Sequence, residues 1–217
     1  MTIRLSREDF VARLPELPPG GRRLIALAGP PGAGKSTLSD WLLGELDRAA
    51  PGRAAVLPMD GFHFDDMVLE ARGDRPRKGA PHTFDTGGLT TTLKRLVENP
   101  ECEIAIPVFD RAIEIARAGA RIIGPDVRTI LVEGNYLLLD DAAWSPMRAF
   151  FDVTAFIDVP EATLRERLAA RWVGYGLDEA AIHAKLEGMK SVREQESGLD
   201  PIFRWEERER ENRMIRR

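Results

Sequence analysis

The sequence has little cysteine: Cys102 is its one thiol among 217 residues, so no disulfide can form within the chain. Such scarcity is typical of a protein from a reducing compartment, and a lone cysteine in an apolar run is more often packing than a catalytic thiol. No apolar run approaches the ~20 residues that a membrane span needs. The first residues, "MTIRLSREDFVARLPEL", lack the apolar core of a signal peptide. These absences predict a cytoplasmic protein with no membrane partner.

An excess of basic residues is missing as well. The formal net charge is −4 and the sequence pI is about 5.6, which argues against a broad nucleic-acid-binding face. An apolar fraction of 43% and a charged fraction of 30% are ordinary for a globular protein. The length suits a single domain over 1–217 with a small inserted lid. We expect no nucleic-acid partner.

Short apolar runs recur between helical patterns, which is typical of a parallel sheet covered on both faces. A capping box at Ser6 and Asp9 predicts a short N-terminal helix that buries Phe10. The predicted fold is α/β, a three-layer doubly wound parallel sheet of P-loop NTPase type, with ligands at the carboxyl ends of its strands. The strands are expected at 23–28, 54–60, 103–110, 128–134 and 155–160, with a helix around 89–98.

Residues 29–37 read "GPPGAGKST" and follow the first apolar run directly. Glycines let the backbone turn so that successive N–H groups point at phosphate oxygens, and the helix that follows adds the positive end of its dipole. Lys35 supplies a charge to the outer phosphates, and the Ser36 hydroxyl suits magnesium. The loop predicts a nucleoside triphosphate with Mg²⁺. The residues expected to hold the nucleotide are Gly29, Pro30, Pro31, Gly32, Ala33, Gly34, Lys35, Ser36 and Thr37.

Two carboxylates stand at the ends of predicted strands. Asp60, at the exit of the second strand, would face the crevice beside the phosphate loop, where a general base could take a hydroxyl proton. Alternatively, "DG" is an ordinary turn with a capping aspartate. Glu133 closes the strand "TILVEG" and is placed to hold magnesium through water, the alternative being a capping or ion-paired glutamate.

Five motifs in order, "GPPGAGKST", "MDGFH", "RKGAPHTFD", "IPVFDR" and "ILVEGNYLLL", resemble the superfamily of phosphoribulokinase, uridine kinase and bacterial pantothenate kinase. Within it, the chain is most similar to members described as fructose-transport-system or nucleoside kinases, from about residue 22 to about residue 187. The resemblance implies that Asp60 is the catalytic base and Glu133 the magnesium-associated acid, and that the protein is a homodimer. The residues it places in or near the acceptor pocket are His63, Lys78, Phe84, Asp85, Asp110, Arg111 and Asn135. For His82, in the same motif, three interpretations compete: hydrogen bonding in the pocket, loop structure, or no role.

A lid is expected over about 161–188, formed by a helix, two hinge glycines and a second helix. Arg167 and Arg171 are four residues apart and share a helical face, whereas Arg165 is expected to point elsewhere. Superfamily members close an arginine-bearing lid over the phosphates, which gives Arg167 and Arg171 a catalytic role. Alternatively, both arginines are solvated on a surface helix.

From about residue 189 to 217 the resemblance stops, and the tail is almost entirely charged. Related kinases have an adenine-contacting segment and a last apolar strand there, whereas this tail offers only "PIF". Two explanations compete: a divergent end, and a shift in reading frame near residue 188. Either explanation leaves the adenine contacts undefined.

The leading interpretation is a phosphotransferase that uses ATP and Mg²⁺ to phosphorylate a hydroxyl of a small polar acceptor, a fructose-like sugar or a nucleoside. A pantothenate-kinase-like activity is the alternative within the same class. A regulatory or inactive nucleotide-binding ATPase is the alternative from another class. A guanine-nucleotide switch is disfavoured because no Asn-Lys-x-Asp motif occurs.

Overall fold

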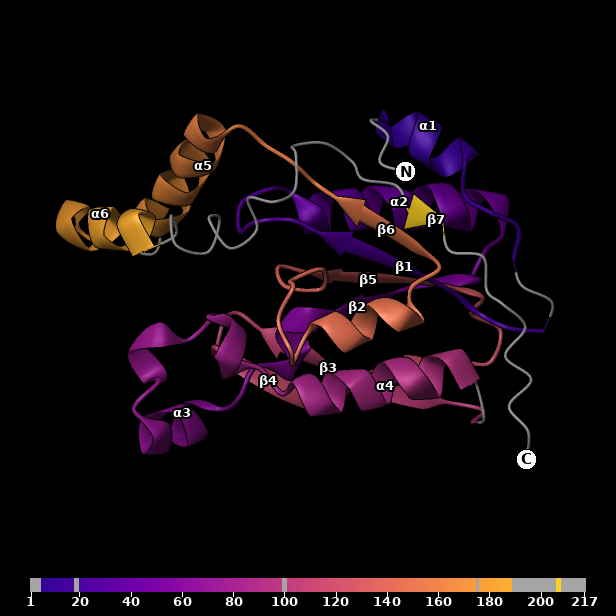
Figure 1. Cartoon of the computed structure of the whole chain (residues 1–217), viewed down its shortest axis with the longest axis horizontal. Coiled ribbons are helices and arrows are strands. Elements are labelled where there is room, and N and C mark those ends of the chain that lie inside the picture. Colours follow the sequence, from indigo (N-terminus) through magenta and orange to yellow (C-terminus); the bar gives the residue numbers. More distant parts are fainter. Residues whose placement is uncertain (1–4, 18–19, 99–100, 175, 189–205, 208–217) are drawn as a thin grey trace.

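The computed structural model describes residues 5–17, 20–98, 101–174, 176–188 and 206–207. Its centre is a five-stranded sheet in the order β2-β5-β1-β6-β7 (Figure 1). The first four of these strands are parallel, and β7 pairs antiparallel with β6. The strands are β1 (Arg23–Ala28), β2 (Ala54–Pro58), β5 (Thr129–Gly134), β6 (Val153–Phe156) and β7 (Glu206–Glu207). The predicted α/β fold with a parallel sheet is confirmed.

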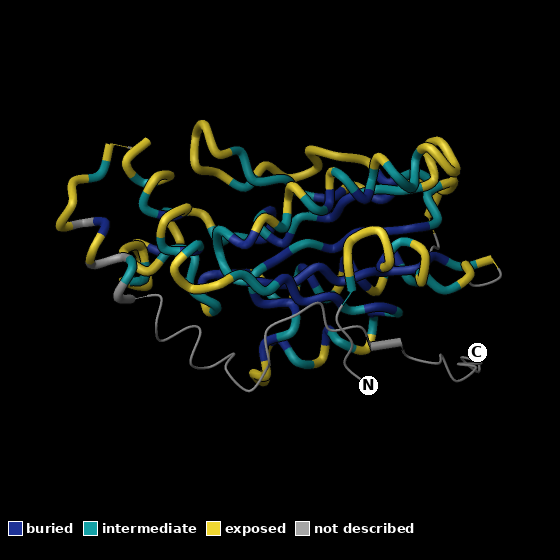
Figure 2. The backbone as a smooth tube through the Cα atoms, turned by 90° about the horizontal axis from the view of Figure 1, so that it is seen from above, coloured by how far each residue is buried: buried dark blue, intermediate teal, exposed yellow. Residues whose placement is uncertain are grey.

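Helices cover both faces of this sheet, with α1 and α2 on one side and α4 on the other (Figure 1). Strand β1 alternates between the two layers: Leu24 packs in one cluster with Leu93 of α4, and Ile25 in another with Leu42 of α2. The central strands are therefore buried along their length (Figure 2). The helices are α1 (Arg7–Ala12), α2 (Lys35–Ala49), α3 (Asp66–Arg72), α4 (Thr86–Glu98), α5 (Glu161–Gly174) and α6 (Glu179–Gly188).

The N-terminal helix starts as predicted. The Asp9 N–H donates to the Ser6 hydroxyl oxygen at 3.0 Å, and Phe10 is buried in the cluster with α2. This cap satisfies one of the amide groups that the first turn of a helix leaves unpaired. Among the described residues, the structure has no helix of the length and apolar character that crossing a membrane requires.

The apolar run at 103–110 is a strand, but it does not join the parallel sheet. It forms β3 (Ile104–Asp110), which pairs antiparallel with β4 (Ile115–Ile123) in a separate hairpin. This hairpin packs on the turn after β2: a Cβ atom at Gly61 would lie 2.5 Å from the Pro107 carbonyl oxygen. Strand β4 was not predicted, because most of its residues are exposed and carry no apolar alternation.

Parallel strands end at one edge of the sheet, and this edge holds the residues of interest. In the register of the sheet, Glu133 of β5 lies between Leu27 of β1 and Pro58 of β2. The loop after β1 and the turn after β2 are therefore neighbours of Glu133. The predicted last strand "PIF" and the question of divergence or frameshift lie outside the described residues, of which Glu206–Glu207 alone belongs to the tail.

Candidate active site

A cleft of about 1930 Å³ opens at the carboxyl edge of the sheet. Its walls come from the loop after β1, the turn after β2, residues 75–82, the end of β5 and the helices α5 and α6. Seven of the nine loop residues expected to hold the nucleotide line it. The predicted site residues that also line it are Asp60, His63, Lys78, His82, Phe84, Arg111, Glu133, Asn135 and Arg171.

The phosphate loop is shaped by its glycines. Gly32 and Gly34 have φ angles of 83° and 92°, a region that other residues rarely adopt, and Gly34 is the N-cap of the 15-residue helix α2. Gly29 and Ala33 lie behind the cleft wall. A Cβ atom at Gly29 would meet the Ile157 carbonyl oxygen at 2.8 Å, so this glycine allows a close approach of two backbones. The loop thus exposes backbone amides at a helix N-terminus, which is an anion-binding arrangement.

The ammonium of Lys35 stays at this loop. Its Nζ donates to the carbonyl oxygens of Gly29 and Pro30 at 2.9 and 3.0 Å. These bonds hold the charge beside the amides of the loop, where the outer phosphates of a nucleotide would lie.

Ser36 and Glu133 meet across the floor of the cleft. The Ser36 hydroxyl donates to the Glu133 carboxylate, with its Oγ 2.9 Å from Oε2. Burial raises the pKa of the Glu133 carboxyl, and the hydrogen bond from Ser36 acts in the opposite direction. A hydroxyl and a carboxylate side by side are hard oxygen donors of the kind that Mg²⁺ takes, together with phosphate oxygens and water.

Asp60 lies on the 3₁₀ turn Met59–Phe62 that follows β2, and its carboxylate faces the cleft. Its Oδ2 accepts a hydrogen bond from the guanidinium of Arg111, which follows β3. The side chain of Asp60 is 27% exposed, so a ligand in the cleft can reach it. The hairpin and the turn after β2 together position this ion pair.

His63 packs as an aromatic side chain. Its ring centroid lies 4.0 Å from that of Phe84 and 4.9 Å from that of Phe109. Nδ1–H donates to the Asp60 carbonyl oxygen at 2.8 Å, since a carbonyl only accepts. Burial lowers the pKa of the His63 imidazole, which favours the neutral ring.

The segment 75–82 carries the basic wall of the cleft. Lys78 Nζ donates to Oδ1 of Asp66 at 2.6 Å and to the Glu114 carbonyl oxygen at 2.8 Å. His82 Nε2 lies 3.3 Å from Oδ1 of Asp74. Two chain segments far apart in sequence therefore fix Lys78, whereas His82 is held within its own loop.

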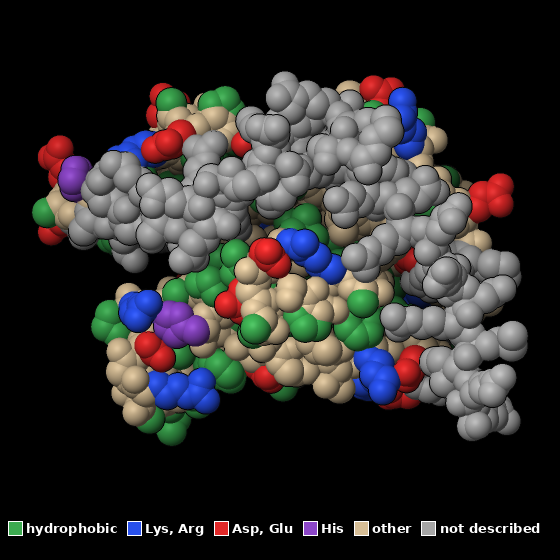
Figure 3. Space-filling view, in the orientation of Figure 1, with side chains coloured by type: hydrophobic (Ala, Val, Ile, Leu, Met, Phe, Trp, Pro, Cys, Tyr) green, Lys and Arg blue, Asp and Glu red, His purple; other side chains and the backbone are tan. Residues whose placement is uncertain are grey.

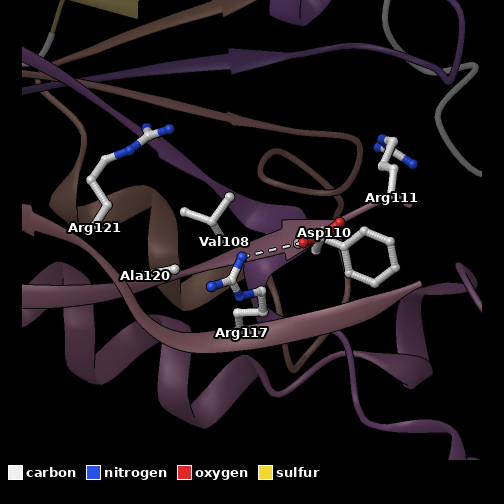
Figure 4. A pocket seen from close by; sticks show the side chains of 7 residues that line it. Val108, Asp110, Arg111, Arg117, Ala120 and Arg121 are labelled. Atoms are coloured by element: carbon white, nitrogen blue, oxygen red, sulfur yellow. Dashed lines mark hydrogen bonds and ion pairs between the residues drawn. The ribbon is translucent and has the colours of Figure 1, made fainter. Parts of the chain in front are cut away.

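Besides Gly29 and Ala33, three predicted site residues do not line the cleft. Asp85 caps α4, because its Oδ1 accepts from the Gly88 N–H at 2.8 Å. Asp110 pairs with Arg117 at 3.3 Å in a second, smaller pocket on the hairpin, where Arg111 points away from this pair (Figure 4). Arg167 donates to the Gly32 carbonyl oxygen at 3.2 Å, so it touches the phosphate loop from behind.

Helix α5 lines the cleft with Arg165 and Arg171, whereas Arg167 and Arg171 were expected. Arg171 lines the cleft, but so does Arg165, whose Nη1 lies 3.6 Å from Oε1 of Glu161 one turn earlier. The prediction that Arg165 points elsewhere is wrong. Leu164 and Leu168 are the buried anchors of α5, and a Cβ atom at Gly32 would approach Leu168 to 3.1 Å. This packing rotates the face with Arg165 toward the cleft.

Some cleft residues were not predicted. Tyr136 donates its hydroxyl to the Gly79 carbonyl oxygen at 2.7 Å and packs against Trp144 and Phe84. Phe109 stands inside the motif "IPVFDR", and Tyr136 follows Asn135 in "EGNYLLL", so both motifs held a signal for them. Trp144 has no local signal, because it reaches the site by folding back from the loop after β5.

The first strand of the parallel sheet enters helix α2 through a glycine-rich loop. Lys35 and Ser36 lie at this turn, and Glu133 lies opposite. This arrangement defines a P-loop nucleotide-binding protein.

No protein-family model matches the chain. The uncharacterised protein YggC of Escherichia coli K12 is 38% identical over 185 residues, 82% of this chain and 75% of that protein. A candidate uridine kinase of Schizosaccharomyces pombe is 35% identical over 72% of this chain and 68% of its own.

Among solved structures, a candidate fructose transport system kinase from Silicibacter sp. TM1040 superimposes with a TM-score of 0.75. The two sequences are 44% identical, and the match covers 83% of this chain and 86% of the chain in that structure. The chain belongs to the P-loop kinase superfamily of phosphoribulokinase, uridine kinase and bacterial pantothenate kinase. The resemblance found in its motifs is thereby confirmed.

Proposed function

We propose that this protein transfers the γ-phosphate of ATP to a hydroxyl of a small polar acceptor, with Mg²⁺ as the metal. The observation that carries the proposal is Asp60, whose carboxylate faces the same cleft as the phosphate loop. A nucleotide switch or a plain ATPase needs no base at this strand end. A sugar or a nucleoside is the acceptor class that the superfamily resemblance favours, and a pantothenate-like acid is the alternative.

The transfer needs a hydroxyl oriented toward the terminal phosphate. The hydroxyl oxygen of the acceptor forms the new bond to the γ-phosphorus while the bond to the β–γ bridging oxygen breaks, and ADP leaves. Asp60 accepts the proton that the hydroxyl loses. Lys35, held at the loop carbonyls, offsets the charge of the outer phosphates.

The residues present fit a magnesium ion. Ser36 and Glu133 would hold it directly or through water, and the ion would neutralise phosphate charge when bound. Burial of Glu133 leaves its carboxylate in need of a positive partner, which supports this role. On the opposite wall, Arg165 and Arg171 of α5 would stabilise charge on the transferring group and help to exclude water.

The test is release of ADP from ATP and Mg²⁺ in the presence of single acceptors: fructose, other hexoses, uridine, cytidine and pantothenate. A water-only sample serves as the blank. Stimulation by one compound identifies a kinase together with its acceptor. ATP binding with no stimulation by any small hydroxyl compound would favour the regulatory ATPase instead.

A further inference from the structure

Two cations flank one aromatic ring beside Asp60. Lys78 Nζ lies 5.3 Å and Arg111 Cζ lies 5.6 Å from the ring centroid of Phe109. Lys78, Phe109 and Arg111 all line the main cleft, and His63 packs on the same ring. The space next to the candidate base is therefore bordered by positive charge and an aromatic face.

The carboxylates near this wall are unevenly shared among its cations, and Glu114 adds an acidic residue to the cleft lining. Asp66, which lies outside the cleft lining, serves two cations at once: its Oδ1 binds Lys78 at 2.6 Å and its Oδ2 binds Arg75 at 2.7 Å. Arg77 lines the same wall, and among the described residues no acid pairs with its guanidinium. Figure 3 shows Lys and Arg side chains gathered beside a histidine at the lower left, on the lobe built around α3.

Arg111 is bound to one of the two carboxylate oxygens of the candidate base. Its guanidinium occupies Oδ2 of Asp60, and its own side chain is 61% exposed, whereas Lys78 is only 11% exposed. Moving Arg111 off Asp60 for a neutral acceptor would separate two opposite charges without replacement. An acceptor that carries its own anionic group would instead offer the Arg111 guanidinium a new charged partner, to which charge-assisted hydrogen bonds can form.

We propose that the acceptor carries an anionic group, a carboxylate or a phosphate, which binds Arg111 and Lys78 beside Phe109 and draws Arg111 away from Asp60. This inference rests on the proposed function and narrows it to hydroxy acids and phosphorylated sugars. Neutral sugars and nucleosides would leave the ion pair of Asp60 and Arg111 closed. By binding Arg111, the acceptor would thus free the Asp60 carboxylate to accept the proton of the acceptor hydroxyl.

Matched pairs of compounds test the charge alone: pantothenate against panthenol, gluconate against glucose, and fructose 6-phosphate against fructose. Each is assayed for ADP release with ATP and Mg²⁺, and for binding by calorimetry with ADP and Mg²⁺ present. We expect the anionic member of at least one pair to exceed its neutral partner by about tenfold or more in affinity and in kcat/KM.

Two variants, Arg111→Gln and Lys78→Gln, test whether these cations bind the anionic group of the acceptor. Each should raise the KM of the anionic acceptor by about tenfold or more, reducing the preference within its pair. Arg111→Lys should restore part of that preference. Arg117→Gln is the matched control, because Arg117 lies on the same hairpin but pairs with Asp110 outside the cleft (Figure 4).

The outcomes separate this inference from the proposed function. Equal turnover of both members of every accepted pair would overturn the anionic acceptor and leave the kinase intact. Selective binding of an anionic member without any ADP release would support the anion site and overturn the kinase. Binding of no anionic member, in a protein that still binds ADP, would overturn the inference by itself.

Discussion

The Asp60 carboxylate and the Arg111 guanidinium form an ion pair that joins the turn after β2 to the end of β3. The two residues are 51 positions apart in the chain, and the pair closes one side of the cleft opposite the phosphate loop. The candidate base and the cation paired with it therefore follow strands of two separate sheets. Single substitutions at these two residues and their neighbours can therefore test the proposed acceptor site.

Asp60→Asn keeps the shape of the side chain and removes its basicity. We expect the variant to lose acceptor phosphorylation by at least about a hundredfold, because general-base catalysis typically contributes that much or more. Its affinity for ATP should stay within about twofold, since Asp60 does not belong to the phosphate loop. ADP release and calorimetric titration with ATP check the two halves of this prediction.

Asp110→Asn serves as the control for that variant, because Asp110 pairs with Arg117 away from the cleft. It should leave both measurements unchanged. Equal turnover by Asp60→Asn and the parent protein would remove Asp60 from the mechanism.

The structure and the family resemblance suggest different roles for Asp85, a helix cap and an acceptor-pocket residue. Its carboxylate caps α4 through the Gly88 N–H, so Asp85→Ala should lower the free energy of unfolding by about 1 kcal/mol. The KM for the acceptor should not change. Urea denaturation and steady-state kinetics measure these two quantities. A raised KM with unchanged stability would instead place Asp85 in the acceptor pocket.

Much of the fold could be predicted from the sequence, because its central strands are buried on both faces. Runs such as Arg23–Ala28 and Thr129–Gly134 have apolar centres and are buried almost throughout, and their parallel pairing follows from the helical segments between them. The hairpin of β3 and β4 could not be predicted in this way. Strand Ile115–Ile123 carries mostly small and basic residues and is largely exposed, so its own composition does not indicate a strand that pairs with β3.

The same distinction holds for the site. The phosphate loop, Asp60 and Glu133 could be placed because each lies at or just after the carboxyl end of a strand of the parallel sheet. Asp85 has motif neighbours in the cleft, but its side chain turns back to a helix terminus. The orientation of Arg165 and the approach of Trp144 depend on how α5 and the loop after β5 pack, which local spacing does not determine.

The arginines of α5 should differ in their effects. Arg165→Gln and Arg171→Gln should each lower kcat by about a hundredfold or more, because both residues line the cleft and would stabilise charge on the transferring phosphate. Arg167→Gln should act mainly on the KM for ATP, since Arg167 supports the Gly32 carbonyl from behind. Steady-state kinetics with both substrates varied would show the split. A larger loss of kcat in Arg167→Gln than in Arg165→Gln would contradict this assignment.

Glu133 links stability to pH. Burial raises the pKa of its carboxyl above the ordinary value of 4.5, so the native state holds this proton more tightly than the unfolded chain. The contribution of Glu133 to the free energy of unfolding is therefore largest below pH 4.5 and falls as the pH rises through the native pKa. Glu133→Gln does not titrate. Without nucleotide and metal, we expect this variant to be more stable than the parent at about pH 7.5, with the difference shrinking toward about pH 4.

The same variant should lose function as it gains stability. If Glu133 is the magnesium partner of Ser36, then Mg²⁺ with ATP should stabilise the parent more than it stabilises Glu133→Gln, and the Mg²⁺ dependence of ADP release should shift to higher concentration. Urea denaturation across pH, with and without Mg²⁺ and ATP, measures both effects. Glu114→Gln is the matched control, because Glu114 also lines the cleft but its side chain is exposed. A pH-independent stability difference between Glu133→Gln and the parent would show that the buried carboxylate is not the cause.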